Sequence, residues 1–135
     1  MKTNKKSWAI AVLVLMNMLP YLSRIGGGWT WVAQYWPDPG HEIFGLLFFH
    51  SWYSTAAIPV ILGIFFARKS KLPWLLPLLV VTVLTVFINH DYDLASYAQA
   101  AIGLMVFPVF TMLVGFVALG LGLFSQWWAA TRSSR

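Results

Sequence analysis

The chain has 135 residues, of which 59% are hydrophobic, 17% are aromatic and only 10% are charged. A soluble domain carries about a quarter charged residues, so this composition excludes an ordinary water-soluble protein of this length. The sequence contains no cysteine, which excludes disulfides, thiolate metal sites and thiol catalysis. We therefore predict a single integral membrane domain over residues 1–135.

The net charge of +5 comes from basic residues in short clusters at the ends of apolar runs. That arrangement is typical of orientation in a bilayer. It does not form a basic face with interleaved aromatic residues, so we expect no nucleic-acid partner.

The first apolar run covers residues 8–23 and follows three lysines. At 1.5 Å per residue it reaches only about 24 Å of a hydrocarbon core of about 30 Å. We therefore expect Arg24 to extend towards the interface and complete the span. A cleaved signal peptide is the alternative, although no small-residue cleavage site directly follows the run.

Three glycines then precede an aromatic segment that contains Trp29, Trp31, Tyr35 and Trp36. Aromatic rings with a polar edge favour the headgroup layer. We predict a short helix along the outer interface, hinged by the glycines. Burial between the spans is the alternative.

Three further spans are predicted at residues 43–67, 72–89 and 97–124. The second span ends at a tight basic cluster in residues 68–71, and a serine and a glutamine in residues 96–99 have the spacing of a capping box. The pattern predicts an all-α protein with four transmembrane helices.

Sidedness follows from the charges. Eight of the nine basic residues fall on one side of the predicted membrane, which the positive-inside rule assigns to the cytoplasm. The four acidic residues fall on the other side. We therefore predict an antiparallel four-helix bundle with both termini in the cytoplasm, and the lysine-led start with minimal loops favours a bacterial inner membrane.

The outer loops gather a polar cluster. Its members are Asp38, His41, Glu42, His90, Asp91 and Asp93. Imidazoles and carboxylates are able to bind a divalent cation or move protons, and the metal candidates are His41, His90, Asp91 and Asp93. The alternative is that these residues are helix caps and turn residues, because no spaced metal motif is present.

His50 lies about seven residues into the second predicted span, roughly 10 Å below the outer interface, where an ionisable side chain is costly. It is the first residue in a predicted row of polar side chains between two helices, which we call the polar seam. The seam consists of His50, Ser51, Ser54 and Thr55 on the second span and Thr82, Thr85 and Asn89 on the third. A proton or ligand role is one interpretation, and interhelical hydrogen bonding worth about 0.6 kcal/mol per bond is the other. No second histidine lies at matching depth, so we expect no haem and no other cofactor.

The fourth span carries small residues at Thr111, Gly115, Ala118 and Gly122. Such a smooth face lets another backbone approach closely, either a neighbour in the bundle or a second protein. Together with the aromatic segment it is the predicted interface.

No nucleophile–base pair, phosphate loop or dinucleotide fingerprint is present, so we predict that the chain is not an enzyme. The leading hypothesis is a small accessory or interaction protein of the inner membrane, a subunit of a membrane complex or an immunity-type protein, acting through its outer face. It binds a membrane protein or itself. The alternative is a small oligomeric transporter or channel component that moves protons or a cation through His50 and the outer cluster.

Overall fold

A computed structural model describes residues 4–34, 50–68, 70–92 and 100–132 of the chain. Every regular element within these ranges is a helix, and no strand occurs in them. Three helical stretches are long and apolar enough to cross a membrane, namely Lys5–Gly27, Leu72–His90 and Met105–Arg132. The all-helical part of the prediction is thus confirmed, and these three stretches meet the length and composition that a membrane span requires.

The N-terminal part consists of helix α1, a 3-10 turn and a short helix α2. Their bounds are Lys5–Leu22, Ile25–Gly27 and Trp29–Ala33. Gly28 lies between the last two with a φ of 87°, a backbone conformation that L side chains rarely adopt. This glycine therefore provides the hinge from which the aromatic segment departs.

The next described segment is helical from His50 to Phe66. It contains a 3-10 turn, η2 at Thr55–Ala57, and helix α4 at Ile58–Phe66. Pro59 has no N–H to donate to the carbonyl of Thr55, and the Ile58 N–H bonds to that carbonyl instead. The proline thereby explains the tightened turn. The predicted second span also included residues 43–49, which lie outside the described residues.

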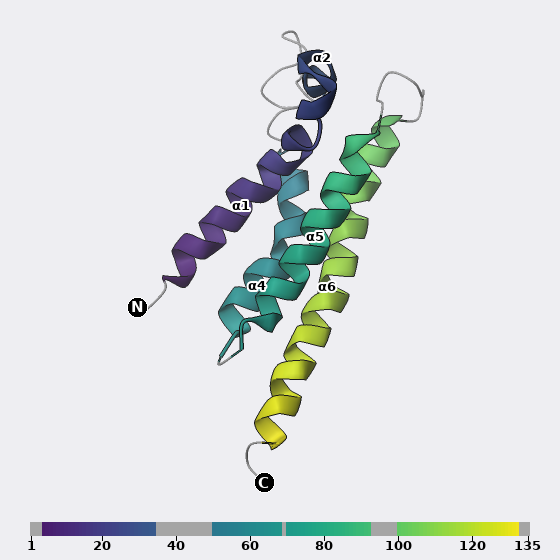
Figure 1. The fold of residues 1–135 in the computed structure, drawn as a ribbon. Helices are drawn as coiled ribbons and strands as arrows, with labels where there is room; N and C mark the ends of the chain where they lie inside the picture. The colour runs from purple at the N-terminus through teal and green to yellow at the C-terminus, as the bar shows by residue number, and fades with distance from the viewer. Residues whose placement is uncertain (1–3, 35–49, 69, 93–99, 133–135) are drawn as a thin grey trace.

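The two longest helices are α5, Leu72–His90, and α6, Ala100–Arg132. They lie side by side (Figure 1). Pro73 occupies the first turn of α5, and the Leu72 N–H donates to Ser70 Oγ at 3.1 Å. The predicted capping box in residues 96–99 lies outside the described part of the chain. With 33 residues, α6 is about 50 Å long, against about 28 Å for the 19 residues of α5.

The four long segments, α1, His50–Phe66, α5 and α6, alternate in direction. The start of α1 and the end of α6 therefore lie at the same end of the molecule (Figure 1). The start of α1 is attached to the end of α4, because Lys5 Nζ donates to the carbonyls of Phe65 and Ala67 at 2.9 and 3.2 Å. The buried core lies between α1, the His50–Phe66 segment and α5. It includes Val12, Met16, Ala57, Val60 and Val81.

The small-residue face of α6 packs inside the molecule. A Cβ on Gly115 would lie 2.6 Å from Pro59 Cγ and 2.8 Å from Val81 Cγ2. A Cβ on Gly122 would lie 2.8 Å from the Leu72 carbonyl oxygen. Ala118 and Thr111 are buried as well. Two elements, α4 and α5, therefore take up the close approach that this face permits.

Candidate functional site

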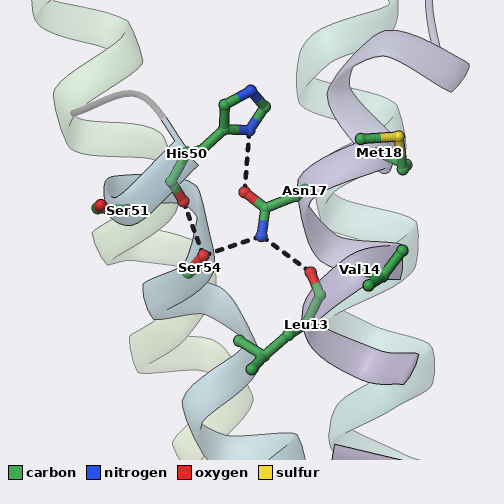
Figure 2. A pocket seen from close by; sticks show the side chains of 7 residues that line it. All are labelled: Leu13, Val14, Asn17, Met18, His50, Ser51 and Ser54. Atoms are coloured by element: carbon green, nitrogen blue, oxygen red, sulfur yellow. Dashed lines mark hydrogen bonds between the residues drawn. The ribbon is translucent and has the colours of Figure 1, made fainter. Parts of the chain in front are cut away.

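A polar cluster joins α1 to the His50–Phe66 segment within the apolar part of the molecule (Figure 2). His50 Nδ1 lies 3.0 Å from Asn17 Oδ1. Asn17 Nδ2 donates to Ser54 Oγ and to the Leu13 carbonyl, both at 2.9 Å. Ser54 Oγ donates back to the His50 carbonyl at 2.7 Å. The second nitrogen of the imidazole, Nε2, lies 3.4 Å from the Tyr21 hydroxyl.

The hydrogen-bond donors and acceptors of this cluster determine which ring nitrogen of His50 carries the proton. Both Asn17 bonds through Nδ2 are donations, so its Oδ1 accepts, and the partner proton must lie on His50 Nδ1. In a neutral ring Nε2 then carries no proton and accepts a hydrogen bond from the Tyr21 hydroxyl. A neutral imidazole with its proton on Nδ1 therefore fits these contacts, which suits its apolar surroundings.

The cluster borders a shallow groove of about 410 Å³ that opens on the side of the molecule. We call it the lateral groove. It is lined by Leu13, Val14, Asn17, Met18, His50, Ser51 and Ser54 (Figure 2). Ser51 is exposed and points away from the hydrogen-bonded cluster. The groove therefore combines an apolar surface with polar groups.

A second polar contact lies between the same segment and α5. Tyr53 donates its hydroxyl proton to Asn89 Oδ1 at 3.0 Å, and Asn89 Nδ2 donates to the Thr85 carbonyl at 2.7 Å. All three residues are buried. Thr55 instead donates to the Trp52 carbonyl of its own helix, and Thr82 is half-buried on α5.

The predicted seam is thus divided between two faces. The structure places His50 and Ser54 against α1, whereas Asn89, which donates to the Thr85 carbonyl, contacts Tyr53. Successive residues of a helix are about 100° apart, so Tyr53 and Ser54 face different neighbours. The two polar stripes that we expected to face each other therefore have different partners, since His50 and Ser54 bond to Asn17 on α1 and Asn89 bonds to Tyr53.

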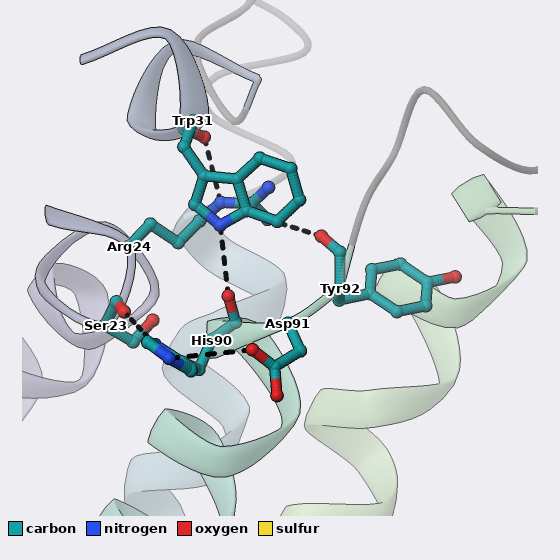
Figure 3. Close-up of polar contacts among 6 residues, drawn as sticks. All are labelled: Ser23, Arg24, Trp31, His90, Asp91 and Tyr92. Atoms are coloured by element: carbon teal, nitrogen blue, oxygen red, sulfur yellow. Dashed lines mark hydrogen bonds and ion pairs between the residues drawn. The ribbon is translucent and has the colours of Figure 1, made fainter. Parts of the chain in front are cut away.

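The end of the molecule opposite the start of α1 and the end of α6 is held together by Arg24, which is fully buried (Figure 3). Its Nε donates to the Trp31 carbonyl at 2.9 Å, its Nη1 to the Tyr92 carbonyl at 2.8 Å and its Nη2 to Gln34 Oε1 at 2.6 Å. The guanidinium carbon also lies 4.4 Å from the centroid of the Trp31 ring. The expectation that Arg24 reaches outward is wrong, because the aromatic segment folds over it and supplies its acceptors.

His90 extends this group of contacts across to α5. Its Nδ1 lies 2.9 Å from the Ser23 carbonyl, and the Trp31 Nε1–H donates to the His90 carbonyl at 3.0 Å (Figure 3). His90 Nε2 lies 3.5 Å from Asp91 Oδ1, and both side chains are exposed. We call Ser23, Arg24, Trp31, His90 and Tyr92 the outer clamp. It ties the end of α1, the aromatic segment and the end of α5 together.

Within the described residues, no group of three or more His, Asp or Glu side chains is placed to hold a metal ion. Only His90 and Asp91 of the predicted outer cluster belong to the described part of the chain. The remaining members, Asp38, His41, Glu42 and Asp93, lie outside it, as do Tyr35 and Trp36 of the predicted interface.

Comparisons with protein-family models, curated proteins and solved structures gave no match for this chain. Its function is therefore inferred from its own residues.

The aromatic segment is divided by the fold into a buried and an exposed side. Trp31 lies over Arg24 in the outer clamp, whereas Trp29 is 75% exposed. The predicted contact surface on this segment therefore depends on Trp29 among the residues that the structure describes.

Sequence reasoning missed three residues that organise the two polar contacts, namely Asn17, Tyr21 and Tyr53. A signal for the first two was present, because they are the polar side chains of an otherwise apolar run and are spaced one helical turn apart. Tyr53 carried no such signal, since a tyrosine beside aromatic neighbours is also typical of lipid contact.

Proposed function

We propose that this chain is a non-enzymatic interaction protein of a bacterial inner membrane, either a subunit of a membrane complex or an immunity-type protein. In this proposal the His50–Phe66 segment is part of a full second span, which completes an antiparallel bundle of four transmembrane helices. The basic residues at one end of the helices support a cytoplasmic location for both termini. The described ones are Lys5, Lys6, Arg68, Lys71 and Arg132.

The observation that carries the proposal is the lateral groove. Its polar side chains, Asn17, His50 and Ser54, bond to one another but border a surface that opens sideways. A transmembrane helix of a partner protein would cover these groups and offer them further hydrogen bonds. Each such bond contributes only about 0.6 kcal/mol, so close packing would supply most of the affinity. The polar groups would fix the register of the partner helix along the groove.

The position of the groove agrees with action near the outer face. Asn17 lies five residues before the end of α1 at Leu22, or about 8 Å along the helix. A partner helix seated there would end near the aromatic segment, where Trp29 is exposed. Tryptophan is enriched in protein interfaces, so Trp29 is the natural second contact.

The transporter alternative has one supporting observation, the chain of hydrogen bonds from Tyr21 through His50 and Asn17 to Ser54. Tyr21 and His50 are able to exchange a proton, whereas the Asn17 amide does not readily relay one. Ser54 returns its bond to the His50 carbonyl, however, and the polar residues of α5 face another part of the segment. The interaction protein therefore remains the proposal that the geometry supports best.

Site-specific photo-crosslinking in native membranes tests the proposal. A photoreactive side chain is placed at Val14, which lines the lateral groove and is 57% exposed, or at Leu79 on α5, which is 62% exposed and lies outside the groove. We expect a discrete adduct with one membrane protein at Val14 and no such adduct at Leu79. Adding Asn17→Leu to the Val14 variant should reduce its yield severalfold.

Equal adducts at both positions, or an adduct unchanged by Asn17→Leu and by His50→Leu, would contradict a specific partner in the groove. Proteoliposomes of the purified chain provide the opposing test. Proton or cation flux that is lost on His50→Ala would favour the transporter alternative instead.

A further inference from the structure

The C-terminal part of α6 extends past the beginning of α5 (Figure 1). Gly122 lies against the backbone of Leu72 and Pro73, so the residues of α6 that follow it project beyond α5. Ten residues, Leu123 to Arg132, form this projection, which is about 15 Å long.

Between this projection and the connection from α4 to α5 lies a groove of about 790 Å³. We call it the basic groove. Its lining includes Arg68, Ser70 and Gln126 together with the apolar side chains of Phe66, Leu72 and Trp127. The Arg68 backbone N–H donates to Gln126 Oε1 at 3.0 Å, which attaches the connection to α6. This hydrogen bond holds the polar side of the groove against α6.

The charged residues at the basic groove are all basic. Arg68 lines the groove, and Lys71 lies one residue before the start of α5. Lys5 donates to the carbonyls of Phe65 and Ala67, which lie next to the groove. The sequence contains no aspartate or glutamate from residue 43 to 90 or from residue 94 to the end. Within the described residues, the Arg68 guanidinium has no acidic partner. An anion is therefore the ligand that this charge pattern complements.

We propose that the basic groove binds the headgroup of an anionic phospholipid, with its phosphate at Arg68. The apolar lining distinguishes this ligand from free phosphate. Phe66 and Leu72 line the groove, are 56% and 47% exposed, and provide a surface for acyl chains. Trp127 also lines the groove, and tryptophan rings are typical of the headgroup layer. Basic pockets between membrane helices on the cytoplasmic side bind acidic headgroups by this combination of charge and apolar contact.

Native mass spectrometry of the purified full-length chain tests this site without any protein partner, so its outcome is independent of the proposed function. The protein is equilibrated in mixed micelles with equal amounts of phosphatidylglycerol and phosphatidylcholine. We expect severalfold more phosphatidylglycerol than phosphatidylcholine to remain bound. Arg68→Gln should lower that preference by about fivefold.

Lys6→Gln is the matched control, because Lys6 is exposed at the same end of the molecule but does not line the groove. It should leave the preference unchanged, and the melting temperature of each variant verifies that it folds. Equal retention of the two lipids, or an equal loss with Lys6→Gln, would overturn the proposal. Release of the lipid by millimolar inorganic phosphate alone would assign the groove to a free anion instead.

Discussion

At the scale of single residues, Arg24 shows why one side chain is required rather than another of the same charge. Its three donors reach acceptors on α2, on the residue after it and beyond the end of α5, while its planar face stacks on Trp31. Only the rigid fork of a guanidinium reaches several fixed acceptors and stacks at the same time. The charge is thus satisfied by carbonyl oxygens of the outer clamp and by the side-chain oxygen of Gln34.

Arg24→Lys should lower the free energy of unfolding in detergent micelles by about 2 kcal/mol, since an ammonium loses at least one charged hydrogen bond and the stacking. Thermal or denaturant unfolding followed by circular dichroism measures this change. Arg132→Lys is the control, because Arg132 also stacks on a tryptophan, Trp128 at 4.9 Å, but is exposed at the end of α6. Its effect should stay below about 0.5 kcal/mol, and equal losses in both variants would contradict the role given to burial.

At the scale of helices, close backbone contact at the start of α5 fixes how α4 and α6 pack. Gly63 of α4 approaches the Pro73 carbonyl and the Trp74 Cα, and Gly122 of α6 approaches Leu72 and Pro73 from its own side. Since lipid provides no hydrophobic driving force between helices, such close packing is a main source of association. The two glycines therefore act as structural contacts within the chain.

Gly63→Ala should destabilise the protein by about 1–3 kcal/mol, because the added methyl group meets backbone atoms that are unable to move aside without shifting α5. Unfolding in detergent measures the loss. Gly120→Ala is the matched control on α6, since a Cβ there meets no atom within 4 Å. It should be neutral or stabilising by up to about 1 kcal/mol through helix propensity. A Gly63→Ala protein as stable as the Gly120→Ala protein would refute the packing argument.

At the scale of the whole molecule, charge and length give the two ends different properties. The end with the start of α1 and the end of α6 carries the described basic clusters and the projecting part of α6. The opposite end carries the outer clamp and Asp91. Orientation, lipid contact and partner contact are therefore expected at different places along the helices.

The absence of cysteine allows this orientation to be measured directly. Single-cysteine variants Asn4→Cys, Asp91→Cys and Thr131→Cys report the start of α1, the end of α5 and the end of α6. A membrane-impermeant thiol reagent applied to intact spheroplasts should label Asp91→Cys and leave the other two unlabelled until the membrane is broken. Labelling of Asn4→Cys and Thr131→Cys on opposite sides would contradict the four-span topology.

The helical class and the apolar stretches could be predicted from the sequence, because hydropathy is a local property that neighbouring residues share. The predicted third span, 72–89, differs from α5 by one residue, whereas α6 continues eight residues past the predicted end at Phe124. The extension was missed since the composition after Phe124 turns aromatic and polar, which is typical of an interface but does not stop a helix. His50 was identified by its depth, whereas its partners on α1 were not.

The sequence by itself determined that this chain is helical and that it contains stretches long and apolar enough to cross a membrane, because composition and spacing along the chain suffice for both. The tertiary structure alone decided which polar groups meet. Asn17 rather than Thr85 faces His50, and Arg24 is buried under Trp31 rather than extended. The physical reason is that helix rotation and neighbour order follow from packing over the entire chain, and a rotation of about 100° brings a different side chain to the contact.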